Sequence, residues 1–179
     1  MKGYILPSQL HQSHDRLTRA QQDTLKRQPE LQRQFPDARK IDEILILICG
    51  HGGRDDRCGT LGPILKAEFE DKLRRQNMTV LNEETTAQTA ETGPPSTDAP
   101  PAARVGLISH IGGHKWAGNV IVYVPPGFNG NGLAGKGIWY GRVEPGMVEG
   151  IVEKTVLQGK VIGDLFRGGI DADREILRL

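Results

Sequence analysis

The stretch ILILICGHGGRDDRCGTLGPILKAEFEDKLRRQNMTVL, residues 44–81, decides the fold of this chain. It follows an acidic residue and begins with an almost unbroken branched apolar run, which predicts a fully buried strand over residues 43–48. A helix should follow, with Thr60 as its N-cap and Pro63 in its first turn. Its inward face is expected to carry Leu61, Ile64, Leu65, Phe69 and Leu73. A second strand at residues 78–81 would complete a right-handed β-α-β unit with parallel strands.

The sequence after this unit predicts the rest of one domain over residues 41–179. Strands are expected at residues 105–109, 119–124 and 137–143, the last two as an antiparallel hairpin. Glu144 and Pro145 open a second helix through about Leu157, and Gly159 should stop it. Its inward residues are expected to be Val148, Ile151, Val152 and Val156. This order predicts an α/β fold of the thioredoxin-like kind, with a four- to five-stranded mixed sheet flanked by helices.

Two segments are expected to lie outside this domain core. Residues 1–40 form a polar N-terminal extension, in which residues 12–34 could make a surface helix that Pro29 breaks. Residues 82–104 contain four prolines and no large apolar side chain. Such a segment buries too little surface to offset the entropy of ordering it, so we expect a disordered insertion there.

Composition argues against several classes of partner. The net charge of +1, with scattered basic residues and few aromatic ones, gives no reason to expect nucleic acid. No apolar run is long enough for a membrane span, and the first residues lack the apolar region of a secretory signal. Two cysteines make no disulfide framework, which favours a reducing compartment. No catalytic acid–base pair stands out, so we expect no independent catalytic activity.

The residues that carry chemistry are two spaced pairs in glycine-rich loops. Cys49 and Cys58 are the only cysteines, and His110 and His114 follow the strand predicted at residues 105–109. Glycines permit a close approach of the backbone to a bound group. Arg54, Arg57 and Lys115 are expected to favour thiolate over thiol.

Three interpretations of these four residues stay open on the residues alone. They could be ordinary core and loop residues, although four together in two glycine-rich loops, each at a strand end, argue against this. They could hold structural zinc, because H-x3-H falls within zinc-finger spacing, whereas the wide cysteine spacing argues against zinc. They could hold a [2Fe–2S] cluster with two cysteines on one iron and two histidines on the other, as in Rieske centres. A thiol oxidoreductase ranks last because no C-x-x-C is present.

The second loop resembles part of a known group of proteins. HIGGHKWAGNVIVYVPPG at residues 110–127 and GIWYGRVEPGMVEGIVEKTV at residues 137–156 are similar to the C-terminal half of thioredoxin-like [2Fe–2S] ferredoxins. In those ferredoxins a C-x3-C pair precedes the strand. Here His110 and His114 stand where that cysteine pair would be.

A narrower resemblance extends from residue 44 to the end of the chain. CGHGGRDDRCG, SHIGGHKWAGN and GIWYGRVEP resemble the fungal sucrase/ferredoxin-like family, which includes the actin-patches-distal and altered-inheritance-of-mitochondria proteins. The resemblance implies a cluster-binding C-terminal domain, without the family's N-terminal domain. Its implied [2Fe–2S] ligands are Cys49, Cys58, His110 and His114.

The function implied by this resemblance is electron transfer. The imidazole ligands would couple this electron transfer to proton transfer. We expect the chain to act in redox homeostasis, with a redox protein as its partner. The sequences of the GIWYGRVEP and LFRGGID segments favour the mitochondrial branch of the family, and so a mitochondrial location over a cytoplasmic one. His51, two residues from Cys49, is given only a minor place as a substitute ligand.

Overall fold

The computed structural model describes residues 2–3, 6–36, 38, 40–53, 55–82, 100–109, 111–173 and 175–178, and it leaves the side chain of His114 undescribed. The chain divides into two compact units, Met1–Lys40 and Ile41–Leu179. Most of the expected disordered insertion, residues 83–99, lies outside the described residues. His110 and Arg54 lie outside them as well.

The described residues of the first unit form three short helices instead of the single surface helix expected over residues 12–34. They are η1 (Gln12–His14), α1 (Arg19–Leu25) and η2 (Pro29–Gln34). Thr18 caps α1 through a capping box with Gln21, and proline at the start of η2 fits a first helical turn, where no N–H is needed.

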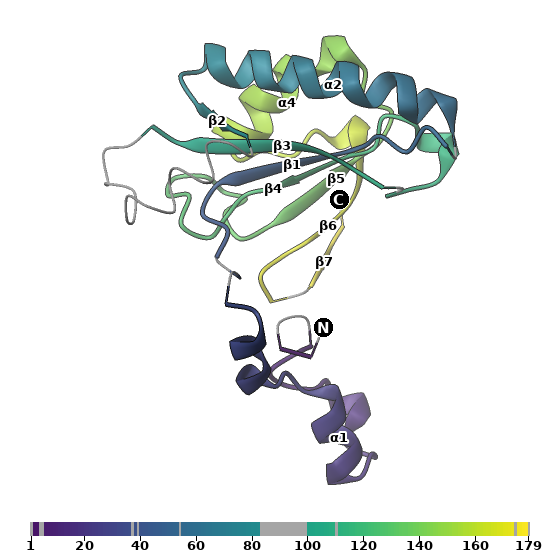
Figure 1. The fold of residues 1–179 in the computed structure, drawn as a ribbon, viewed down its shortest axis with the longest axis vertical. Helices are drawn as coiled ribbons and strands as arrows, with labels where there is room; N and C mark the ends of the chain where they lie inside the picture. Colours follow the sequence, from purple (N-terminus) through teal and green to yellow (C-terminus); the bar gives the residue numbers. More distant parts are fainter. Residues whose placement is uncertain are drawn as a thin grey trace. The chain divides into compact units, whose positions relative to one another are not determined.

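The second unit is built on one sheet of seven strands, drawn in Figure 1. The strand order is β2-β3-β1-β4-β5-β6-β7. The first three in that order run parallel and every later neighbour is antiparallel. The bounds are β1 (Ile44–Cys49), β2 (Thr79–Leu81), β3 (Ala102–Ile108), β4 (Val120–Tyr123), β5 (Gly137–Tyr140), β6 (Phe166–Ile170) and β7 (Ile176–Leu177).

The predicted mixed α/β sheet is confirmed, and it is larger than the expected four or five strands. The five predicted strands are β1 to β5, and the β4–β5 hairpin is antiparallel as expected. The additional β6 and β7 come from the residues after Gly159, for which no strand was predicted. Two consecutive glycines inside β6, Gly168 and Gly169, give it no strand-like apolar pattern.

The strand after the insertion begins earlier than expected. Residues 102–104, assigned to the disordered insertion, lie in β3 and pair with both β1 and β2. The alanine-rich start of β3 lacked a strand signal, but backbone pairing on both sides holds it, and Ala103 is fully buried. Because β3 lies between β1 and β2, the two strands of the β-α-β unit are parallel without being neighbours.

The long helix α2 (Asp56–Arg75) begins five residues before the predicted start, so the predicted N-cap was wrong. Asp55, not Thr60, is the N-cap, since its carboxylate accepts the backbone N–H of Arg57 at 2.9 Å. Pro63 therefore lies inside the helix. Ile64 is 46% exposed and does not belong to the inward face. The residues of α2 that are buried are Cys58, Gly62, Leu65, Phe69 and Leu73.

The second predicted helix is confirmed as a run of three helical segments that lies on the same side of the sheet as α2 (Figure 1). These are η4 (Pro145–Met147), α4 (Val148–Ile151) and the π-helical η5 (Val152–Leu157). Gly159 ends the run with a φ of +65°. The four residues expected to face inward are buried, namely Val148, Ile151, Val152 and Val156.

Within the described residues, no helix is both long enough and apolar enough to cross a membrane.

Candidate metal centre

The structure brings together the two predicted cysteine ligands. Cys49 is the last residue of β1, and Cys58 lies in the first turn of α2. Their side chains are in hydrogen-bonding contact, and neither is part of a disulfide. Both are buried, at 2% and 3% exposure. The first turn of α2 thus places one sulfur against the other at the carboxyl end of a central strand.

Close packing of glycines makes this approach possible. A Cβ built on Gly59 would lie 2.6 Å from the Cα of Gly52, and a Cβ on Gly62 would lie 2.9 Å from the carbonyl oxygen of Cys49. The start of α2 therefore rests directly on the loop that follows β1. Any side chain at Gly59 or Gly62 would push Cys58 away from Cys49.

The protonation of Cys58 differs from the expectation that nearby cations favour the thiolate. Burial raises the pKa of Cys58 to about 11, and contact with Cys49 and the charge of Asp55 act in the same direction. Arg57 lowers the pKa of Cys58, but its effect is the smallest of these contributions. Its guanidinium binds Asp55 through Nε at 3.0 Å and Nη2 at 2.8 Å. Since Asp55 offsets the cation, loss of the Cys58 proton requires a further positive charge, which a metal ion supplies.

The loop that carries the predicted histidines is tied at both ends to the cysteine backbone. At its start, the N–H of Gly50 donates to the carbonyl oxygen of Ile108 at 3.1 Å. At its end, the N–H of Cys49 donates to the carbonyl oxygen of Asn119 at 3.0 Å. The segment between them, residues 109–119, is called the histidine loop below. Both of its ends thus lie beside Cys49.

The imidazole positions remain a prediction. His110 lies outside the described residues, and His114 is described only as the first backbone position of η3 (His114–Trp116). Among the described residues no group of three or more His, Cys, Asp or Glu side chains is placed to hold a metal ion, and neither loop histidine belongs to that set. His51 is exposed, in keeping with a solvated loop residue.

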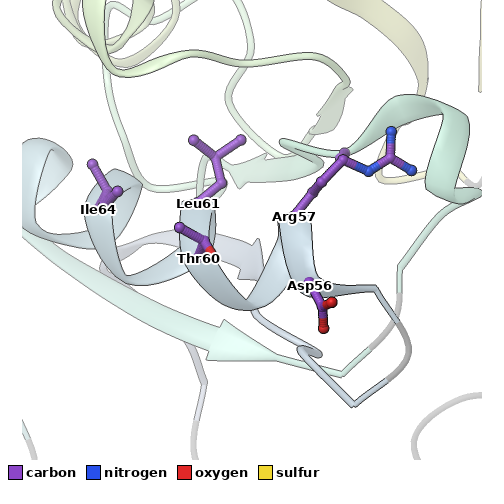
Figure 2. A pocket seen from close by; sticks show the side chains of 6 residues that line it. Asp56, Arg57, Thr60, Leu61 and Ile64 are labelled. Carbon is purple, nitrogen blue, oxygen red and sulfur yellow. The ribbon is translucent and has the colours of Figure 1, made fainter.

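A groove of about 450 Å³ runs from the cysteine-bearing helix to the histidine loop. Figure 2 shows Leu61 and Ile64 projecting from the same side of α2 as Arg57. The partial exposure of Ile64, which the helical pattern did not anticipate, is explained by its place in this groove. The groove is lined by Asp56, Arg57, Thr60, Leu61, Ile64 and Ala117.

Sequence reasoning missed Asn119 and a pair of arginines near the candidate ligands. Asn119 is buried at 2% exposure, and a Cβ on Gly112, between the two histidines, would lie 2.6 Å from its Oδ1. The guanidinium groups of Arg142 and Arg167 lie 4.0 Å and 3.2 Å from the centroid of the Trp116 ring. A polar residue at the start of an otherwise apolar strand was the only signal for Asn119, and none existed for the arginine pair.

Comparison with known proteins gives matches over most of the chain. A protein-family model described as sucrase/ferredoxin-like matches residues 2–168, which includes most of the expected N-terminal extension. The chain is 40% identical over 131 residues to altered inheritance of mitochondria protein 32 of Meyerozyma guilliermondii, which covers 73% of this chain and 36% of that protein. It is 33% identical over 116 residues to actin patches distal protein 1 of Saccharomyces cerevisiae, covering 65% and 30%. The chain thus spans about a third of the length of these relatives.

Among solved structures, the chain is similar to the wild-type thioredoxin-like [2Fe-2S] ferredoxin from Aquifex aeolicus. The identity is 16% and the TM-score 0.43, over 70% of this chain and 97% of that protein.

Proposed function

This chain belongs to the sucrase/ferredoxin-like family, and we propose that it is an electron-transfer domain that holds one [2Fe–2S] cluster through Cys49, Cys58, His110 and His114. The observation that carries the proposal is the contact of the two buried cysteine side chains beside both ends of the histidine loop. Two sulfur and two imidazole donors are the set that a Rieske-type cluster uses.

The cysteines fit the thiolate half of this site. Cys49 is a side-chain hydrogen-bond partner of Cys58, so the two sulfurs lie close enough for one metal ion to bind both. Because burial raises the pKa of Cys58 to about 11, loading at neutral pH must release its proton. Proton release on metal binding is therefore expected and measurable.

The histidines would supply the proton chemistry. When bound, a [2Fe–2S] cluster accepts and returns one electron. Each ligating imidazole keeps its second ring nitrogen, and the pKa of that N–H should be lower when the site carries more positive charge, in the oxidised state. Between the oxidised and reduced pKa values, uptake of an electron is accompanied by uptake of a proton at this nitrogen. Two neutral imidazoles also leave less negative charge than two thiolates, which favours a higher potential than in plant-type ferredoxins.

The partner and compartment are part of the same proposal. An electron carrier without catalytic residues of its own needs a redox protein as donor or acceptor, and we place this exchange in redox homeostasis. The names of several relatives refer to mitochondrial inheritance, which supports a mitochondrial location over the cytoplasmic alternative. Imaging of the full-length protein, tagged at its C-terminus, together with a mitochondrial marker tests the location.

The decisive experiment is the metal content and colour of the chain purified without oxygen and reconstituted with iron and sulfide. We expect a red-brown protein with about two iron and two sulfide per chain. Cys49→Ser should abolish the colour, whereas His51→Ala, a histidine change in the same loop, should keep it. A colourless protein with stoichiometric zinc would contradict the proposal and support the alternative, a structural zinc-binding interaction domain that uses the same four residues.

A further inference from the structure

A second cavity lies beside the histidine loop, and it shares no lining residue with the groove of Figure 2. Its volume is about 220 Å³. It opens between the middle of the loop, strand β5 and the start of strand β6. The residues that line it are Gly112, Gly113, Trp116, Asn119, Trp139 and Arg167.

Two buried N–H donors in this cavity lack a partner. In the part of the chain that the structure describes, the side-chain N–H groups of Asn119 Nδ2 and Trp139 Nε1 make no hydrogen bond. Trp139 pairs in register with Ile121, and Asn119 lies two residues before Ile121, so both side chains belong to one face of the sheet. A buried donor without an acceptor costs about 1–3 kcal/mol, and such groups in folded proteins call for a ligand, ion or water.

Positive charge surrounds the same cavity. The Arg167 guanidinium lies 3.2 Å from the centroid of the Trp116 ring, and the Arg142 guanidinium lies 4.0 Å from the same centroid. Neither arginine has a carboxylate within ion-pair distance among the described residues. Stacking on an aromatic face orients a guanidinium and leaves its N–H edge available for an acceptor.

The lining therefore offers hydrogen-bond donors and positive charge, and no carboxylate. Water could satisfy the two N–H groups and hydrate the exposed Arg167, but it brings no negative charge to the guanidinium. A ligand with several acceptor oxygens and negative charge satisfies both. We propose that this cavity binds a small oxyanion, of the phosphate or carboxylate class, through Arg167, Asn119 and Trp139.

The test is calorimetric titration of the full chain with inorganic phosphate and, separately, with formate. The only two tryptophans of the chain, Trp116 and Trp139, both line the cavity, so intrinsic fluorescence gives a second readout. We expect saturable binding of at least one of the two anions, accompanied by a fluorescence change. A preference for phosphate or for formate shows whether the site binds phosphates or carboxylates.

Two variants and one control locate the binding. Arg167→Gln should weaken binding about tenfold or more, since it removes a charged donor. Trp139→Phe keeps an aromatic side chain, though a smaller one, and removes the N–H donor, so it should weaken binding several-fold. It keeps the proposal testable if Arg167→Gln unfolds the chain. Arg75→Gln removes an exposed charge that pairs with Asp71 on α2, and it should change binding less than twofold.

The outcomes separate this site from the proposed cluster. Titrations are run on the iron-free chain and again after reconstitution, because anion binding requires neither colour nor iron. No saturable heat with either anion, or equal binding by Arg167→Gln, Trp139→Phe and Arg75→Gln, would overturn the proposal. Failure to bind iron while phosphate or formate still binds would overturn only the proposed electron-transfer function.

Discussion

The backbone N–H of Cys49 donates to the carbonyl oxygen of Asn119 at 3.0 Å, and this bond joins the end of β1 to the last residue of the histidine loop. The residues are 70 positions apart in the sequence, from 49 to 119. Because β1 and β4 are antiparallel neighbours, the end of one strand meets the start of the other. The pairing of β1 with β4 thus brings the cysteine pair and the histidine loop together at the same end of these two strands.

Packing of the histidine loop on Asn119 can be tested with two glycines of the same loop. Gly112→Ala should destabilise the chain by about 1–3 kcal/mol, because its Cβ would lie 2.6 Å from Oδ1 of the buried Asn119, which must then shift. Gly113→Ala is the control, since its Cβ would meet only Trp116 Cδ1 at 3.8 Å. Urea denaturation measures both. Equal midpoints for the two variants would show that the loop does not rest on Asn119.

Contact between α2 and the loop that follows β1 can be tested at Gly59. Alanine in a helix interior is favoured over glycine by about 1 kcal/mol, but a Cβ here would lie 2.6 Å from the Cα of Gly52, and backbone cannot give way as a flexible side chain can. We expect Gly59→Ala to lower the iron content after reconstitution. Gly53→Ala, whose nearest neighbour would be His51 Nε2 at 3.8 Å, should keep it. Full iron content in Gly59→Ala would mean that the close approach is dispensable.

Imidazole ligation predicts how the reduction potential depends on pH. In the wild-type protein the potential should fall by up to about 59 mV per pH unit between the oxidised and reduced pKa values, as for one proton per electron. His110→Cys or His114→Cys should keep a cluster, lower its potential and flatten this dependence. Potentiometric titrations from pH 6 to pH 9 measure both effects. A potential unchanged by either substitution would rule out histidine ligation.

The hydroxyl of Tyr140 links strand β5 to η5 and to the segment after it. It lies 2.6 Å from Thr155 Oγ1 and accepts the backbone N–H of Ile162 at 3.2 Å. Tyr140→Phe leaves that N–H without its acceptor and should cost about 1–3 kcal/mol of unfolding free energy. Tyr123→Phe, at a half-buried position of β4, should change it by less than about 0.5 kcal/mol. Thermal or urea unfolding of both variants distinguishes a buried network from general sensitivity of tyrosines.

Ionisation of the same tyrosine predicts a loss of stability in alkali. Burial raises the pKa of Tyr140 above its ordinary value of 10.0. The unfolded chain therefore releases this proton near pH 10 while the folded chain keeps it, so the contribution is complete below pH 10 and is lost as the pH rises above it. Unfolding midpoints of the iron-free chain between pH 8 and pH 11 should fall less steeply in Tyr140→Phe than in Tyr123→Phe. Parallel curves would contradict the assignment.

Local patterns in the sequence were sufficient for most elements of the second unit. The apolar run of β1 and the spacing of Leu65, Phe69 and Leu73 predicted a strand and an inward helix face that the structure confirms. The start of α2 was predicted wrongly, because Asp55 and Thr60 are both good caps and only tertiary contact selects the first. Glycines at the start of the helix, which oppose helix formation in isolation, are needed there for contact with the loop after β1.

What the sequence determined by itself was the class of fold and the identity of the four candidate ligands, since both follow from local pattern and spaced motifs. Only the tertiary structure decided that Cys58 lies within α2 against Cys49, that β6 and β7 enlarge the sheet, and that Trp116, Asn119, Trp139 and Arg167 surround one cavity. These features depend on contacts between segments far apart in the chain. Pairing partners and close backbone approaches are properties of the assembled sheet, and no local periodicity encodes them.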